Sequence, residues 1–298
     1  MTGEECAALS YCSDVLRGLA CRELPKPPEL QHGGASLQRW QLWQEESHKL
    51  WQDYLSLRRR HLGFAPLAGF PERSAQVLVL IEMRAHQDLD IVLRQSLSTL
   101  HGQWAILLVC GEKNRSFVEE VVRNWSFVHL MCLPREDLSR QAYANFRRSQ
   151  ELLAQLKAIG AEVVLFLECD AVLLRPGVER FLHFDLVGAP WAWAKSQDAA
   201  VGNGGLCVRR LDFMCEALRC MGASHLGEVE DSWWPRNEDI GFAQAALQMG
   251  SQVPRWKLAA EFSVESMFHP RPVGCHKPWQ YLLPSDMLQL LELWEVVD

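Results

Sequence analysis

The stretch AQVLVLIEMR, residues 75–84, decides the fold of this chain, because its pattern returns three more times along the sequence. It is a continuous apolar run, rich in β-branched residues, and it ends beside Glu82 and Arg84. Runs of this kind are typical of strands buried on both faces of a sheet. Similar runs at 104–111, 127–134 and 162–174 are separated by helical spacing at 89–100, 116–125 and 139–159. The alternation predicts an α/β, Rossmann-like fold, a mostly parallel sheet with helices on both faces.

Three regions are predicted along the chain. Residues 37–60 place large apolar side chains at three-and-four spacing, which predicts an amphipathic helix within an N-terminal extension and linker, 1–74. That helix is expected to pack on the main domain, and a surface for a partner protein is the alternative. The main domain is expected to span 75–280, with a short strand within 184–191 and helices near 212–221 and over 238–250. A C-terminal helix (285–296) within 281–298 is expected to pack on it.

The composition limits the class of protein. With 48% hydrophobic and 22% charged residues among 298, the chain is globular. The net charge of −7, and the lack of a long basic block beyond RRRH at 58–61, argue against a general nucleic-acid binder. We find no secretory signal, no window of ~18 apolar residues that could span a membrane, and no zinc-ligand spacing among the cysteines. We therefore expect a cytoplasmic protein with reduced thiols.

Two carboxylates end the fourth predicted strand. Glu168 and Asp170 follow an apolar run, and residues two apart on a strand point to the same side. Ligands of open α/β sheets bind at the carboxyl ends of the strands, so the pair is placed to hold a divalent cation. The alternative is that both are strand-end acids that face water or cap the next turn. Because no glycine motif of the dinucleotide-binding or P-loop type follows the first strand, those two classes are disfavoured.

A glycine-rich segment, VGNGGLCVRR at 201–210, precedes another predicted strand. Gly202, Gly204 and Gly205 remove side chains, which lets another molecule approach the backbone closely. Asn203 beside them can offer its amide to a hydroxyl group. For a glycine cluster alone, a turn that feeds a strand is the alternative.

Five further side chains suit a transfer reaction. Glu238 and Asp239 open a predicted helix, where a carboxylate could take a proton from a hydroxyl; helix capping is the alternative. His276 and Lys277 pair a common metal ligand with a cation that suits phosphate, although an ordinary surface loop would also contain them. Trp191 could form an apolar wall for a sugar, with core packing as the alternative.

The order of these signals resembles that of the GT-A glycosyltransferases. The motifs FDLVGAPW, VGNGGLCVRR, NEDIGFA, FSVES and GCHKPW, with residues 80–117, are similar to an uncharacterised glycosyltransferase-like family of GT-A-like architecture. The similarity covers residues 75–280, and GCHKPW also looks like the HKPW-type ending of glycogenin-like enzymes. Such enzymes usually have Asp at both ends of the metal-binding triplet or a neutral residue first, whereas this chain has Glu168, Cys169 and Asp170.

The resemblance implies a metal-dependent glycosyltransferase that moves a sugar from a nucleotide-diphosphate donor, with a UDP-sugar expected, to an acceptor hydroxyl. It implies Mn²⁺ or Mg²⁺ held by Asp170 and His276, with Glu168 assisting. Asp239 would act as base and Glu238 would bind the acceptor, which suits inversion, although retaining enzymes keep acids nearby. The donor-binding set is expected to be Glu82, Arg84, Glu168, Trp191, Gly202, Asn203, Gly204, Gly205 and Lys277.

Two other functions stay open. A sugar- or nucleotide-binding protein of this fold that has lost turnover is compatible with the glutamate at position 168. An interaction protein that works through the 37–60 helix is the second. In the transferase, a loop with Trp233 and Trp234 is expected to close over the donor and exclude water.

Overall fold

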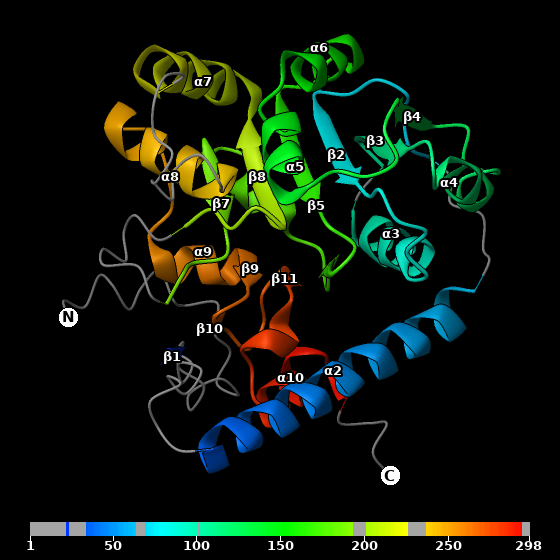
Figure 1. Cartoon of the computed structure of the whole chain (residues 1–298), viewed down its shortest axis with the longest axis vertical. Coiled ribbons are helices and arrows are strands. Elements are labelled where there is room, and N and C mark those ends of the chain that lie inside the picture. The colour runs from blue at the N-terminus through cyan, green and yellow to red at the C-terminus, as the bar shows by residue number, and fades with distance from the viewer. Residues whose placement is uncertain are drawn as a thin grey trace.

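The computed structural model describes residues 22–23, 34–63, 69–100, 102–192, 201–225 and 237–293 (Figure 1). A six-stranded sheet of order β4-β3-β2-β5-β8-β7 lies at its centre. Its strands are β2 (Gln76–Ile81), β3 (Trp104–Gly111), β4 (Val128–Leu133), β5 (Val163–Leu167), β7 (Leu186–Gly188) and β8 (Leu206–Arg210). The first four strands pair in parallel, whereas β8 runs antiparallel to β5 and β7. The prediction of an α/β fold with a mostly parallel sheet is confirmed.

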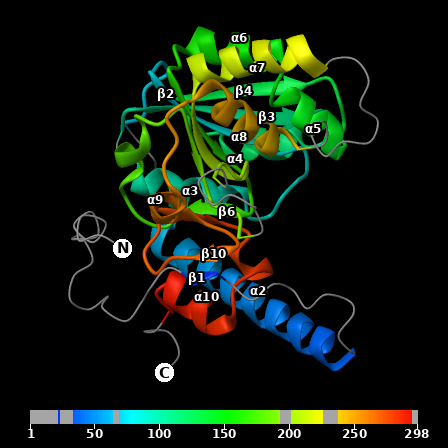
Figure 2. The ribbon, with the colours of Figure 1, turned by 90° about the vertical axis from the view of Figure 1, so that its left-hand side faces the viewer.

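The sheet is buried on both faces because the strand residues alternate between two cores. In β2, Leu78 and Leu80 belong to the first core, and Val77, Val79 and Ile81 belong to the second. Helices cover both faces (Figure 2). The first core includes residues of α3 (Leu89–Thr99), α4 (Arg115–Val121) and α9 (Trp256–Phe262), and the second includes residues of α6 (Gln150–Ile159), α7 (Leu211–His225) and α8 (Glu238–Met249).

The helix expected over 139–159 is divided in the structure. It forms α5 (Arg140–Phe146), which ends before Arg147, and α6, which Ser149 caps at its N-terminus. The Ser149 hydroxyl accepts a hydrogen bond from the Leu152 N–H at 3.1 Å, which is the usual N-cap contact. The prediction of one helix was therefore wrong, and the break places Arg147 at the end of α5.

The strand expected over 162–174 is also divided. It ends at Leu167, and the Ala171 N–H then donates to the Glu168 carbonyl at 3.0 Å, which closes a tight turn. After this turn the chain enters β6 (Ala171–Leu173), which belongs to a different sheet. The apolar pattern continues through the turn, which is why the sequence alone indicated one strand.

A three-stranded sheet of order β6-β11-β9 receives the chain after this turn. β6 pairs antiparallel with β11 (Gly274–His276), and β11 pairs in parallel with β9 (Ser263–Val264). The register places Ala171 opposite His276, and the Lys277 N–H donates to the Asp170 carbonyl at 2.9 Å. Two segments separated by about a hundred residues are thereby brought to one edge of the main sheet.

The helix predicted over 37–60 is α2 (Gly34–Leu62), which lies beside the C-terminal helix α10 (Pro284–Leu290) (Figure 1). The ring of Trp51 lies 4.9 Å from that of Trp279, within η4 (Pro278–Gln280). The expected packing of this helix on the main domain is therefore observed, and α2 contacts the segment that follows His276. The remaining short elements are β1 (Arg22–Glu23), paired with β10 (Met267–Phe268), and η2 (Val178–Phe181).

The C-terminal helix ends at Leu290, earlier than the predicted 285–296, and residues 294–298 lie outside the described ranges. Among the helices that the structure describes, none is both long and apolar enough to cross a bilayer. The proposed division at residues 74 and 280 stays a prediction.

Candidate metal centre

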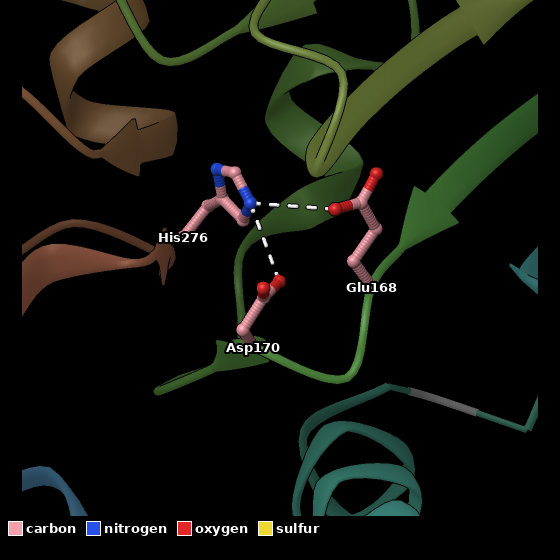
Figure 3. Close-up of side chains that lie close together, drawn as sticks. All are labelled: Glu168, Asp170 and His276. Carbon is pink, nitrogen blue, oxygen red and sulfur yellow. Dashed lines mark ion pairs between the residues drawn. The ribbon is translucent and has the colours of Figure 1, made fainter. Parts of the chain in front are cut away.

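Three side chains predicted as ligands meet where β5 ends (Figure 3). Glu168 follows β5, Asp170 precedes β6, and His276 is the last residue of β11. The His276 Nε2 atom lies 3.5 Å from Glu168 Oε2 and 3.3 Å from Asp170 Oδ1. One ligand atom from each residue lies within 4.8 Å of the other two. We refer to these three residues as the cation site.

The cation site contains two buried polar atoms that form no well-aligned hydrogen bond with any residue that the structure describes. These atoms are Asp170 Oδ1 and His276 Nε2, which lie 3.3 Å from each other. Buried polar atoms are almost always paired, so two that converge indicate a group that binds between them. Carboxylate oxygens and an imidazole nitrogen together suit Mn²⁺, and oxygen ligands also suit Mg²⁺. The residues present therefore fit the divalent cation that the resemblance implies.

Glu265, a residue that the sequence prediction missed, orients the imidazole. It lies between β9 and β10, is buried, and its Oε1 lies 3.0 Å from His276 Nδ1. A carboxylate oxygen can only accept here, so Nδ1 donates and Nε2 faces the two other carboxylates. The amide nitrogen of Asn203 donates to the same Oε1 at 2.8 Å. Carboxylates that accept a hydrogen bond from a metal-ligating histidine commonly orient its ring in this way. The sequence feature that could have indicated Glu265 is its place between two short apolar strands.

The electrostatics keep both carboxyl groups of the cation site ionised. Burial raises the pKa of Glu168, but His276, Arg147 and Lys277 outweigh burial and hold that pKa well below its ordinary value. Burial also raises the pKa of Asp170, and His276 again reverses the direction. Burial lowers the pKa of His276, yet the nearby carboxylates hold it well above its ordinary value. A divalent cation bound here would replace the proton of the imidazolium.

The glycine-rich loop has a structural role that differs from the predicted one. A Cβ atom on Gly205 would lie 2.2 Å from the His276 ring, and a Cβ on Gly204 would lie 3.0 Å from both Arg147 and Glu238. Gly202 adopts φ +122°, a conformation that side chains disfavour. The groups that approach these glycines are therefore the protein's own side chains. Contact of the loop with a sugar stays a prediction.

Asn203, within this loop, has both ends of its side chain engaged. Its amide nitrogen donates to Glu265, as above, and its Oδ1 accepts the Gly205 N–H at 2.9 Å. It is buried, and these contacts support the residues behind His276; a bond from its amide to a substrate hydroxyl stays a prediction. The loop and Glu265 thus act together behind the imidazole.

Glu238 is held in a buried group of charges, which we refer to as the arginine cluster: Arg147, Glu238 and Arg209. Glu238 Oε1 lies 3.1 Å from Arg147 Nε and 2.9 Å from Arg209 Nη2. Burial raises the pKa of Glu238, but the two arginines outweigh burial and lower it. The prediction that Glu238 binds the acceptor does not match these contacts, because its carboxylate is committed to two buried cations. Arg209 lies two residues after Cys207, on the same face of β8. This spacing could have indicated from the sequence that Arg209 is buried.

Asp239 lies beside the arginine cluster, at the first turn of α8. Its Oδ2 accepts the Gly204 N–H at 3.2 Å, and its Oδ1 accepts the Ile240 N–H at 2.8 Å. Burial and the charge of Glu238 raise the pKa of Asp239 to about 6. A carboxylate with this pKa can accept a proton near neutral pH, and the role of Asp239 as a base stays a prediction.

A cavity of about 430 Å³ is lined by Glu168 and Asp170 of the cation site and extends from the end of β2 to Lys277; His276 is not among its lining residues. Glu82 accepts hydrogen bonds from Nε and Nη2 of Arg84, both at 2.8 Å, so the guanidinium is held at the cavity wall. Lys277 Nζ lies 3.1 Å from Asp170 Oδ2. The cavity is lined by Ile81, Glu82, Met83, Arg84, Asp137, Leu138, Arg140, Tyr143, Glu168, Cys169, Asp170 and Lys277.

Two predicted contacts lie elsewhere. Trp191 is buried in the second core and does not line this cavity, so the core-packing alternative matches its position. The predicted closing loop with Trp233 and Trp234 falls outside the described residues.

Comparison with known proteins and families identifies the family of this chain. None of the curated proteins that were searched matches it. The family model described as "Protein of unknown function (DUF5672)" matches residues 128–276, half of the chain. The matched range contains the cation site, the glycine-rich loop, Asp239 and Glu265, while Glu82 and Arg84 precede it and Lys277 follows it. The chain therefore belongs to the DUF5672 family.

Proposed function

We propose that this chain is a metal-dependent glycosyltransferase with a GT-A-like architecture. It would move a sugar from a nucleotide-diphosphate donor to an acceptor hydroxyl. The observation that supports this most is the convergence of Glu168, Asp170 and His276, of which the two carboxylates line a cavity. The imidazole favours Mn²⁺ over Mg²⁺ as the resident cation, and a UDP-sugar is the expected donor.

The positions of the residues support the following roles. Asp170, His276 and Glu168 would hold the divalent cation, which when bound supplies Lewis-acid stabilisation to the leaving diphosphate. Lys277 lies close enough to Asp170 to contact a phosphate at the same place. Arg84, fixed by Glu82, adds a second cation to the wall of the cavity. The two side chains favour an anionic ligand there.

Asp239 would accept the proton of the acceptor hydroxyl. It is bonded to Gly204, whose neighbour Gly205 touches the His276 ring, so the base and the cation site share one loop. This arrangement suits direct attack with inversion, because the acceptor would be deprotonated beside the donor.

The test is a panel of nucleotide sugars incubated with the full chain and Mn²⁺, with release of the nucleoside diphosphate as the readout. Asp170→Asn should reduce release by more than the roughly 10–100-fold that loss of an outer-shell partner costs, because it removes a ligand itself. Asp137→Asn is the matched control, since Asp137 lines the same cavity and lies outside the cation site. Mn²⁺-dependent donor binding without release would instead support a non-catalytic binding protein.

A further inference from the structure

The two oxygens of Glu168 have different surroundings. The Tyr143 hydroxyl donates to Oε1 at 3.0 Å, and Arg147 Nη1 donates to the same oxygen at 3.3 Å. Oε2 instead lies 3.5 Å from His276 Nε2. Tyr143 and Arg147 are four residues apart at the end of α5, so both side chains lie on one face of the helix. One face of α5 thus holds one oxygen and leaves the other turned to the cation site.

Arg147 is fixed from several directions. It is 1% exposed, and its Nη2 donates to the Gly204 carbonyl at 2.8 Å. Its Nε lies 3.1 Å from Glu238, and its guanidinium carbon lies 4.3 Å from the centre of the Phe166 ring. A guanidinium is planar and presents its donors in a rigid fork, so these contacts leave Nη1 pointing at Glu168. The position of the Arg147 Nη1 donor is therefore set by these other contacts and does not depend on the conformation of Glu168.

We propose that Tyr143 and Arg147 are positioning residues that make Glu168 a single-oxygen ligand, by holding Oε1 and leaving Oε2 to the cation. This inference rests on the proposed function. This positioning explains how Glu168 could act as a metal ligand at a position where the resemblance leads us to expect an aspartate. Glutamate has one more rotatable bond, whose freedom would be lost on binding a cation. Two donors on α5 remove that freedom before the cation arrives.

The experiment is a titration of the full chain with Mn²⁺ alone, in which electron paramagnetic resonance measures free Mn²⁺. Tyr143→Phe removes only the hydroxyl and should weaken Mn²⁺ binding ~10-fold, at the lower end of the range for outer-shell partners. Arg147→Gln should weaken binding by ~10–100-fold. Arg148→Gln is the matched control and should leave affinity unchanged, because among the described residues the Arg148 side chain donates to Ala144 and Asn145 of α5 and not to the cation site.

A double variant separates positioning from loss of structure. In a Glu168→Ala background, Tyr143→Phe should cause no further loss of Mn²⁺ affinity, because the carboxylate that the Tyr143 hydroxyl contacts is absent. Combined with Glu265→Gln, on the other side of the imidazole, its effect should persist in full. Thermal unfolding identifies any variant that fails to fold, and Tyr143→Phe carries the test if Arg147→Gln does not fold.

The outcomes are distinguishable. If the wild-type chain binds Mn²⁺ and both Tyr143→Phe and Arg147→Gln bind it equally well, the positioning role is overturned and the cation site stands. If the wild-type chain binds no Mn²⁺, the proposed metal-dependent function is overturned, and the positioning role with it.

Discussion

The cation site and the arginine cluster lie side by side, and each contains buried polar atoms without hydrogen bonds, but their surroundings differ. In the cation site these atoms are Asp170 Oδ1 and His276 Nε2, which lie 3.3 Å apart, and a bound divalent cation would replace the proton of the imidazolium. In the arginine cluster they include the N–H donors at Nε and Nη1 of Arg209. The guanidinium carbon of Arg209 lies 4.4 Å from the centre of the Phe242 ring and 5.1 Å from that of Phe166. Aromatic faces are negative, so they stabilise the cation without a hydrogen bond.

The difference shows which unpaired atoms indicate a ligand. The arginine cluster is complete, because aromatic rings and Glu238 offset its charge. In the cation site, by contrast, one ligand atom from each of Glu168, Asp170 and His276 lies within 4.8 Å of the other two, and the two carboxylates line the cavity. We therefore infer that the arginine cluster is structural and that the cation site binds a ligand.

The largest expected effect is on stability, in the arginine cluster. Glu238→Gln removes the carboxylate that two buried guanidiniums share, and breaking a buried pair in this way costs about 3–5 kcal/mol. Chemical denaturation measures the free energy of unfolding. Glu216→Gln is the control, because Glu216 pairs with Arg219 on the surface of α7, where such pairs contribute about 1 kcal/mol or less. Equal losses in the two variants would contradict a structural role for the cluster.

The same comparison shows how far the sequence could predict the site. Asp170 and His276 were predicted because strand ends and motif order can be recognised without coordinates. Glu265 and Arg209 were missed, because their roles depend on which side chains face them across different elements. The division of the 162–174 strand was also hidden, since its apolar pattern does not change where the chain turns into another sheet.

The second prediction concerns metal affinity in the cation site. Glu265→Gln keeps the size of the side chain but removes the charge that holds His276 Nδ1 as a donor. We expect Mn²⁺ to bind roughly 10–100-fold more weakly, as is typical for loss of an outer-shell carboxylate, when measured by calorimetry. Glu261→Gln is the control, because Glu261 pairs with Arg180 instead. Unchanged affinity in Glu265→Gln would mean that Glu265 does not orient the imidazole.

The smallest expected effect is a pH dependence at Asp239. Burial and the charge of Glu238 raise the pKa of Asp239 to about 6, above its ordinary value of 3.8. Between these values the folded chain keeps a proton that the unfolded chain has lost, so the contribution to stability is full below 3.8 and is lost as the pH rises to about 6. After screening by solvent this loss should be about 1 kcal/mol. Asp239→Asn should remove it, as measured by unfolding at pH values on both sides of the window.

The same pKa connects the two clusters, and the connection can be measured through activity. If Asp239 is the base, transfer should rise as the pH passes about 6, because only the ionised carboxylate accepts a proton. Glu238→Gln removes a negative charge that raises this pKa and leaves Arg147 and Arg209, which lower it. The midpoint of the pH–rate profile should therefore move below 6 in any Glu238→Gln protein that folds. A midpoint that stays in place would show that burial alone sets the pKa of Asp239, and that the arginine cluster supports the site without tuning its base.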